Sequence, residues 1–167
     1  MNYNFDEIIS KIRSGEYKPI GFGSCRRVYD LNDGYVVKVA RDIRGIDQNR
    51  TENSIYQSRK SGFFAEVAAI SDNNRLLVMA KAQKIRNMSA VFQYYKVRNL
   101  SSLVRINNFT EDIKNHRLSR GDLVRASSWG IVDNIPVMID YGLTQNIYIK
   151  YYRFNILAGR RFKILKY

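Results

Sequence analysis

Residues that could bind a phosphate group lie near the start of the chain. A glycine-rich turn contains Gly21 and Gly23 between Ile20 and Val28, and the apolar segment that follows it carries Lys38. Two glycines with this spacing let the backbone pass close to phosphate oxygens and point its N–H groups at them, while a lysine on the next strand supplies positive charge. A glycine pair between two strands is also common in ordinary tight turns, so the turn alone is weak evidence for a phosphate site.

Three carboxylates further along the chain extend this pattern. Glu52 lies in a predicted helix, Asp122 follows Gly121, and Asp140 follows the apolar segment 136–139. Magnesium bound to phosphates prefers carboxylate oxygen, and a carboxylate can accept or orient the proton of a hydroxyl group. Taken singly, they are also explained as an exposed helix acid, a helix cap and a turn residue.

The elements that must position these residues follow from turn and capping signals. Asn4 with Glu7 starts a short helix closed by Gly15, and the segment 32–34, Asn-Asp-Gly, indicates a hairpin. Asp47 can cap a second helix. The first half is predicted to contain helices over 5–14 and 47–60 and strands over 17–20, 28–31, 35–40, 63–71 and 76–79. The second half is predicted to contain helices over 90–97 and 111–117, a loop from residue 121, and strands over 129–132 and 137–139.

Composition and charge limit the classes of function. A chain of 167 residues with 45% hydrophobic content suits one compact unit or two small lobes that share a cleft. The net charge is +13, and ten of the fifteen acids lie in residues 1–72, so the second half is strongly basic. Its last segment, 147–167, alternates basic and aromatic residues. Such a surface favours a polyanion: nucleic acid, an acidic protein, an anionic membrane or ATP.

The sequence gives no sign of a membrane or secretory protein. No transmembrane segment is predicted, because no stretch approaches the roughly 18 apolar residues of a membrane span, and the N-terminus carries acids where a secretory signal needs bases. We therefore expect a cytoplasmic protein. Its one cysteine, Cys25, excludes an internal disulfide and is interpreted as a small loop residue.

Together the chemistry-bearing residues resemble the protein-kinase-like family. The glycine turn resembles its glycine-rich loop, Lys38 its strand lysine, and Glu52 the helix glutamate that pairs with that lysine. Glu66 is a second candidate partner, ranked lower because it lies in a strand-like segment. Asp140, in Asp-Tyr-Gly, resembles the metal-binding aspartate, and Asp122 lies 18 residues earlier, where the catalytic aspartate is expected.

The resemblance implies a fold, two ligands and a site. The fold would be α+β with two lobes: an antiparallel five-stranded sheet plus a helix in residues 1–80, and a reduced, mainly helical lobe in residues 81–167. ATP and Mg²⁺ would bind between them. Lys38 and Glu52 would position the phosphates, and Asp122 would act on the acceptor hydroxyl. Asp140 and Ser127 would bind the metal. The predicted nucleotide contacts are Ile20, Gly21, Gly23, Ser24, Val28, Lys38 and Met79.

Several residues depart from the family pattern. Arg26 replaces the third glycine of the loop, Val124 replaces the usual catalytic-loop lysine, and Ser127 stands where a metal-ligating asparagine is usual. Gly121 before Asp122 is more similar to antibiotic and small-molecule phosphotransferases. Only 25 residues follow Gly142, too few for a full activation segment. The plan is similar to truncated kinase-like effectors of bacterial pathogens and to small phage-encoded kinase-like proteins.

Three functions therefore stay open at this point. The first is an ATP- and Mg²⁺-dependent kinase that phosphorylates serine or threonine in a host or partner protein. The second is a catalytically inactive pseudokinase that binds a nucleotide or a protein partner, as the replacement at Ser127 suggests. The third is a nucleic-acid-binding module that uses the basic second half, supported by charge alone.

Overall fold

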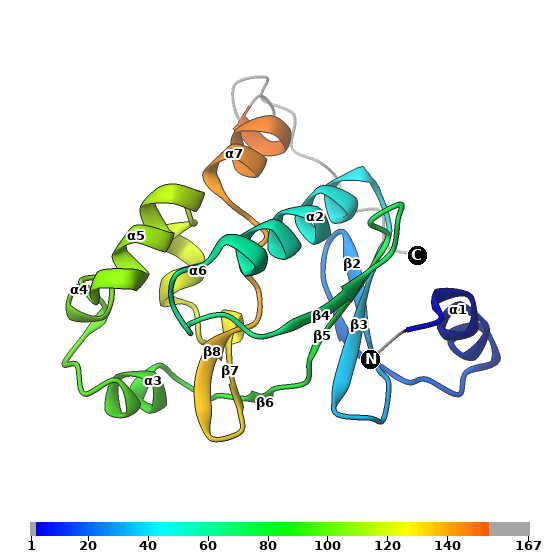
Figure 1. Ribbon diagram of the computed structural model, residues 1–167, viewed down its shortest axis with the longest axis horizontal. Helices are drawn as coiled ribbons and strands as arrows, with labels where there is room; N and C mark the ends of the chain where they lie inside the picture. The colour runs from blue at the N-terminus through cyan, green and yellow to red at the C-terminus, as the bar shows by residue number, and fades with distance from the viewer. Residues whose placement is uncertain (1–2, 154–167) are drawn as a thin grey trace.

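A five-stranded antiparallel sheet forms in the first half of the chain (Figure 1). The structure, a computed structural model, describes residues 3–153. The strands lie in the order β1-β2-β3-β5-β4. The elements of this half are α1 (Phe5–Ser14), β1 (Pro19–Phe22), β2 (Arg26–Asp30), β3 (Tyr35–Ala40), α2 (Ile43–Ser58), β4 (Val67–Ile70) and β5 (Leu76–Ala80). The predicted α+β class and the five-stranded sheet with its helix are confirmed.

The two faces of this sheet pack against different helices. Successive side chains of a strand point to opposite faces. In β3, Val37 is buried with Ile8 of α1, whereas Val36 is buried with Ile55 of α2. Lys38 shares the strand face of Val36 and is therefore turned toward α2.

Helix α1 forms as predicted. The Asn4 side chain accepts hydrogen bonds from the backbone N–H groups of Asp6 and Glu7. Gly15 ends the helix in the left-handed region, at φ 77°, where glycine is favoured. The predicted hairpin at 32–34 also forms, with Asn32 and Gly34 at positive φ.

The prediction that Asp47 caps the second helix is wrong. Helix α2 begins five residues earlier, after Asp42, whose side chain accepts from the N–H groups of Arg44 and Gly45. A Cβ on Gly45 would lie 2.4 Å from the carbonyl oxygen of Cys25, so the first turn of α2 packs directly against the glycine turn. This packing contact therefore selects Asp42, rather than Asp47, as the residue that caps the helix. Asp47 instead accepts from Lys150 and Tyr151.

The remaining elements lie beside this sheet (Figure 1). Strands β6, β7 and β8 form a second, three-stranded antiparallel sheet. The elements of the second half are β6 (Gln83–Lys84), α3 (Ser89–Tyr94), α4 (Leu100–Leu103), α5 (Asn107–His116), α6 (Arg120–Val124), the 3₁₀ turn η1 (Ala126–Ser128), β7 (Trp129–Val132), β8 (Ile135–Met138), α7 (Gln145–Tyr148) and the π-helical turn η2 (Ile149–Arg153). The basic tail predicted over 147–167 lies outside the described residues from residue 154 on.

Several boundaries differ from the prediction for identifiable reasons. The loop predicted from residue 121 is helix α6, in which Leu123 is buried and its carbonyl accepts from the Trp129 indole. The strand predicted over 63–71 is shorter because residues 63–65 bond to β8: Met138 N donates to the Phe63 carbonyl, and Ala65 N donates to that of Met138. Strand β1 extends through Gly21, so the tight turn lies at residues 23–25.

Stacked aromatic side chains join the second half of the chain to the segment after α2. The ring of Phe63 stacks on those of Tyr95 and Phe109, at 4.2 and 4.0 Å between centroids, and meets Trp129 edge-on. Phe109 and Trp129 are fully buried. This cluster joins α5, β7 and the segment after α2. Among the helices of residues 3–153, none is long and apolar enough to cross a membrane.

Candidate nucleotide and phosphotransfer site

A pocket of about 260 Å³ opens between the glycine turn, β3, the end of β5 and the segment after β8. Its walls combine apolar side chains with four cationic residues and one carboxylate, a composition suited to a ligand with both an aromatic and an anionic part. Its lining includes Ile20, Gly21, Phe22, Gly23, Arg26, Val28, Val36, Lys38, Met79, Ser127, Ile139 and Asp140.

Glu52 is the centre of a polar network behind this pocket. Its side chain is fully buried and accepts hydrogen bonds from Lys38 Nζ at 2.8 and 2.9 Å. The backbone N–H groups of Tyr141 and Gly142 also donate to its Oε1. A buried carboxylate needs charged and polar partners of this kind, so the network fixes α2 against the segment 140–142.

Lys38 is held at the base of the pocket by two acceptors. Besides Glu52, its Nζ donates to the carbonyl oxygen of Ile139 at 2.6 Å. Burial and the neighbouring Arg26 guanidinium lower the pKa of Lys38 below its ordinary value, although the Glu52 carboxylate acts in the opposite direction.

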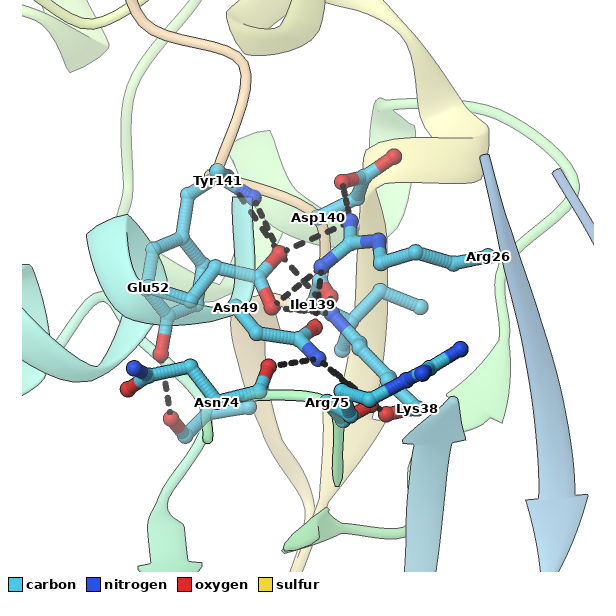
Figure 2. A network of polar contacts seen from close by, with 11 residues as sticks. Arg26, Lys38, Asn49, Glu52, Asn74, Arg75, Ile139, Asp140 and Tyr141 are labelled. Atoms are coloured by element: carbon cyan, nitrogen blue, oxygen red, sulfur yellow. Dashed lines mark hydrogen bonds and ion pairs between the residues drawn. The ribbon is translucent and has the colours of Figure 1, made fainter. Parts of the chain in front are cut away.

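Arg26 turns inward and joins two carboxylates (Figure 2). Its Nη1 lies 2.8 Å from Glu52 Oε2, and its Nη2 lies 3.1 Å from Glu52 Oε1 and 2.8 Å from Asp140 Oδ1. Nη1 also donates to Asn49. Burial acts to lower the pKa of Arg26, but the carboxylates of Glu52 and Asp140 outweigh it and raise that pKa above its ordinary value.

Asp140 lies at the mouth of this network with 49% of its side-chain surface exposed. Burial acts to raise its pKa, but the charges of Arg26 and Lys38 dominate and lower it. Its backbone N–H donates to the Ser128 carbonyl, which ties it to the turn after α6. Its carboxylate is therefore ionised and faces the pocket.

The two residues after Asp140 anchor it from the other side. The buried Tyr141 donates its hydroxyl to the Ala65 carbonyl. A Cβ on Gly142 would lie 2.7 Å from the carbonyl oxygen of Gln48 and 3.1 Å from the Cγ of Glu52. Only glycine therefore lets this segment approach α2 closely enough to bond with Glu52.

The donor set fits a magnesium ion that arrives with a nucleotide. Within residues 3–153, no group of three or more His, Cys, Asp or Glu side chains could hold a metal by itself. Magnesium usually binds through one or two carboxylates plus substrate phosphates and water. Asp140 supplies one carboxylate, and Ser127 lines the same pocket with a hydroxyl group.

Asp122 differs electrostatically from the other two acids. It lies in α6, where the Trp129 indole bonds to the carbonyl of the next residue, Leu123. Burial raises the pKa of Asp122 to about 6, and the nearby charge of Asp140 adds to this effect. The partly exposed Arg125, 3.6 Å away, acts in the opposite direction.

Most of the predicted site residues come together in space. Lys38 pairs with Glu52, as the sequence indicated, and Asp140 lies beside them. Glu66, the rival partner, instead accepts from the Tyr35 hydroxyl in an exposed position. Ser24 is exposed and does not line this pocket, unlike the other predicted nucleotide contacts. The roles of these residues toward a nucleotide stay predictions.

Two network residues were missed by the sequence analysis. Arg26 was assigned to the loop, but it is the first residue of β2 and faces Ala40 of β3. The two-residue alternation back from Val28 would have placed it on the pocket face. Asn49 is buried and donates to the carbonyls of Asn74 and Arg75 while accepting from Arg26. Its contacts are distant in sequence, so no local signal marks it.

Comparison with known proteins gives little guidance. No protein-family model matches the chain, and no curated protein matches its sequence. Among solved structures, the chain is similar to APH(2″)-IIa in its ternary complex with streptomycin and ATP, at 18% sequence identity and a TM-score of 0.41. The matched region covers 68% of this chain and 40% of that one, so the chain spans well under half of that protein's length.

Proposed function

We propose that this chain is an ATP-dependent phosphotransferase with a two-lobed kinase-like fold, the lobes being residues 1–80 and 81–167. The observation that carries the proposal is the buried Lys38–Glu52 pair beside Asp140 at one glycine-lined pocket. A buried lysine and glutamate contribute little net stability compared with apolar residues, so their presence at a pocket favours a functional site.

Each part of an ATP molecule has a matching part of the pocket. The apolar side chains of Val28, Val36 and Met79 would contact the base, because aromatic ligand rings bind to surfaces of this kind. Gly21 and Gly23 allow close approach of the backbone to the phosphates. Lys38 supplies positive charge at their far end.

Asp122 and Asp140 are suited to different steps of the transfer. Asp140, whose pKa is lowered, stays ionised and would hold Mg²⁺ on the phosphates together with the Ser127 hydroxyl. The metal would neutralise charge that develops on the transferred group. Asp122, with a pKa of about 6, is ionised at neutral pH yet basic enough to take up the proton of an acceptor hydroxyl.

The acceptor class is the finer part of the proposal. We assign it to serine or threonine hydroxyls of a partner protein, and the chain acts in a cytoplasm, where ATP is available. Exposed arginines flank Asp122 at positions 120 and 125, which favours an acceptor segment with acidic residues over a cationic one. The single cysteine is free and buried, as suits a reducing compartment.

One observation favours binding without transfer as a second candidate. Arg26 occupies one carboxylate oxygen of Asp140, the group that would hold the metal. If this contact persisted with ATP bound, Asp140 would not be free to hold the metal. The chain would then act by binding the nucleotide without transferring its phosphate.

A labelled-ATP transfer assay tests the proposal. The purified chain is incubated with γ-labelled ATP, Mg²⁺, dephosphorylated casein and a cell extract, and ATP binding is measured in parallel. We expect Asp122→Asn to lower transfer by about 100-fold or more while leaving ATP binding unchanged. The matched control is Asp133→Asn in an exposed turn, which should transfer like wild type.

ATP binding without transfer by the wild type would contradict the transferase and support the occupancy candidate. Equal transfer by wild type and Asp122→Asn would leave the transferase standing but remove Asp122 from the reaction. Absence of ATP binding would overturn both candidates.

A further inference from the structure

Arg26 adds a second cation to the phosphate end of the pocket. Its side chain is 8% exposed, it lines the pocket with Lys38, and it bridges Glu52 and Asp140 (Figure 2). The four charges of this group balance: two cations face two carboxylates. An anionic ligand that enters the pocket therefore meets two positive side chains already held in place.

The contacts of Arg26 divide into a strong and a replaceable part. Its two bonds to Glu52 are bidentate and fully buried, the strongest geometry for this pair. Its bond to Asp140 is single, and Asp140 is half exposed. A phosphate oxygen could therefore take the place of the Asp140 oxygen on Nη2 while the contacts with Glu52 keep the guanidinium in position.

We propose that Arg26 is a phosphate-binding residue that serves as the protein's own cation beside Asp140, so that the pocket binds ATP without a divalent metal. The proposal rests on the nucleotide site proposed above and extends it to how the charge of the triphosphate is neutralised. Arginine suits this role because its planar fork of donors can bond a carboxylate and a phosphate at once.

Metal-free binding of the wild-type chain is the direct test. ATP and adenosine are titrated into the protein by calorimetry, once in EDTA and once in excess Mg²⁺. We expect the dissociation constant of ATP to differ by less than about threefold between the two conditions. In EDTA, ATP should bind at least about tenfold more tightly than adenosine, because charge-assisted bonds to phosphate are worth roughly this much.

Three variants test whether this effect belongs to Arg26. Arg26→Met removes the cation and should abolish the advantage of ATP over adenosine in EDTA, whereas added Mg²⁺ should restore it. Arg27→Met is the matched control, since Arg27 has the same charge on the same strand but is exposed and contacts Phe22 instead. It should behave as wild type. Thermal unfolding of each variant shows whether it is folded, and Arg26→Lys provides a second test that keeps the charge and should retain metal-free binding.

The outcomes separate this inference from the proposed function. ATP that binds only with Mg²⁺, or an Arg26→Met chain that binds metal-free ATP like wild type, would overturn the role of Arg26 and leave the transferase standing. Absence of ATP binding in both conditions would overturn both.

Discussion

The two acidic regions of this molecule use burial in opposite ways. Glu52 and Asp140 face Lys38 and Arg26 at 2.8 Å, and the pKa of Asp140 is lowered. Asp122 is nearly as buried as Glu52 and more buried than Asp140, but the nearest cation is the exposed Arg125 at 3.6 Å, and its pKa is raised to about 6. Partners rather than depth therefore decide whether a buried carboxylate is held ionised or left ready to take up a proton.

This difference fits a division of labour between the regions. A carboxylate that binds charge must stay ionised, whereas a base works best when its pKa lies near the working pH. The charged network also serves the fold, because it joins β2, β3, α2 and the segment after β8. Asp122 makes no such connection. We therefore expect substitutions in the charged network to lower the stability of the fold, and substitution of Asp122 to lower the rate of transfer without unfolding the chain.

The largest effect is expected from the centre of the network. Glu52→Gln leaves Lys38 and Arg26 buried but removes one of the two carboxylates that balance their positive charge. Breaking a buried ion pair in this way costs about 3–5 kcal/mol of the free energy of unfolding, measured by urea denaturation. Glu66→Gln is the control, because Glu66 is exposed and its bond from the Tyr35 hydroxyl is 3.3 Å long. It should change that free energy by less than about 0.5 kcal/mol. Equal losses in the two variants would show that the network does not stabilise the fold.

Asp122→Asn is expected to raise the free energy of unfolding at pH 8 rather than lower it. The pKa of Asp122 is about 6 when folded and about 3.9 when unfolded. The folded state therefore binds this proton more tightly, and stability falls as the pH rises from about 4 to about 6. Asparagine carries no such cost, so the variant should be more stable than wild type by about 1–3 kcal/mol at pH 8 and equal to it near pH 3.5. Urea denaturation at both pH values measures this, and a loss of stability at pH 8 would contradict it.

The sequence predicted the charged network better than its surroundings. Lys38 lies within an apolar strand, where a lone charge needs a partner, and Glu52 lies on the helix that follows. Their pairing was assigned through the resemblance to the kinase-like family, which rests on the order of these motifs along the chain. Asp140 was assigned through the same resemblance, with the apolar segment directly before it as support.

The missed features depend on contacts between distant segments. Asp42 and Asp47 have the same capping chemistry, and only the packing of Gly45 against Cys25 selects the first. The direction of Arg26 depends on where β2 begins, which its pairing with β3 decides. Helix α6 has only five residues, and its N-cap Ser119 makes no capping hydrogen bond with its side chain, so the sequence carried only a weak start signal.

The smallest predicted effect concerns the influence of Arg125 on the pKa of Asp122. Its pairing with Arg125 is weak, because 63% of the arginine side chain is exposed and such pairs are worth about 0.2–1 kcal/mol. Arg125→Met removes a charge that lowers the pKa of Asp122, so that pKa should rise by a few tenths of a unit. The transfer rate increases as Asp122 loses its proton, and the pH of half-maximal rate should therefore shift upward from about 6 by the same amount. High salt should erase the difference between variant and wild type. Arg120→Met, at the other end of α6, is the control for a general loss of positive charge. A downward shift, or an equal shift in both variants, would show that Arg125 does not set the pKa of this base.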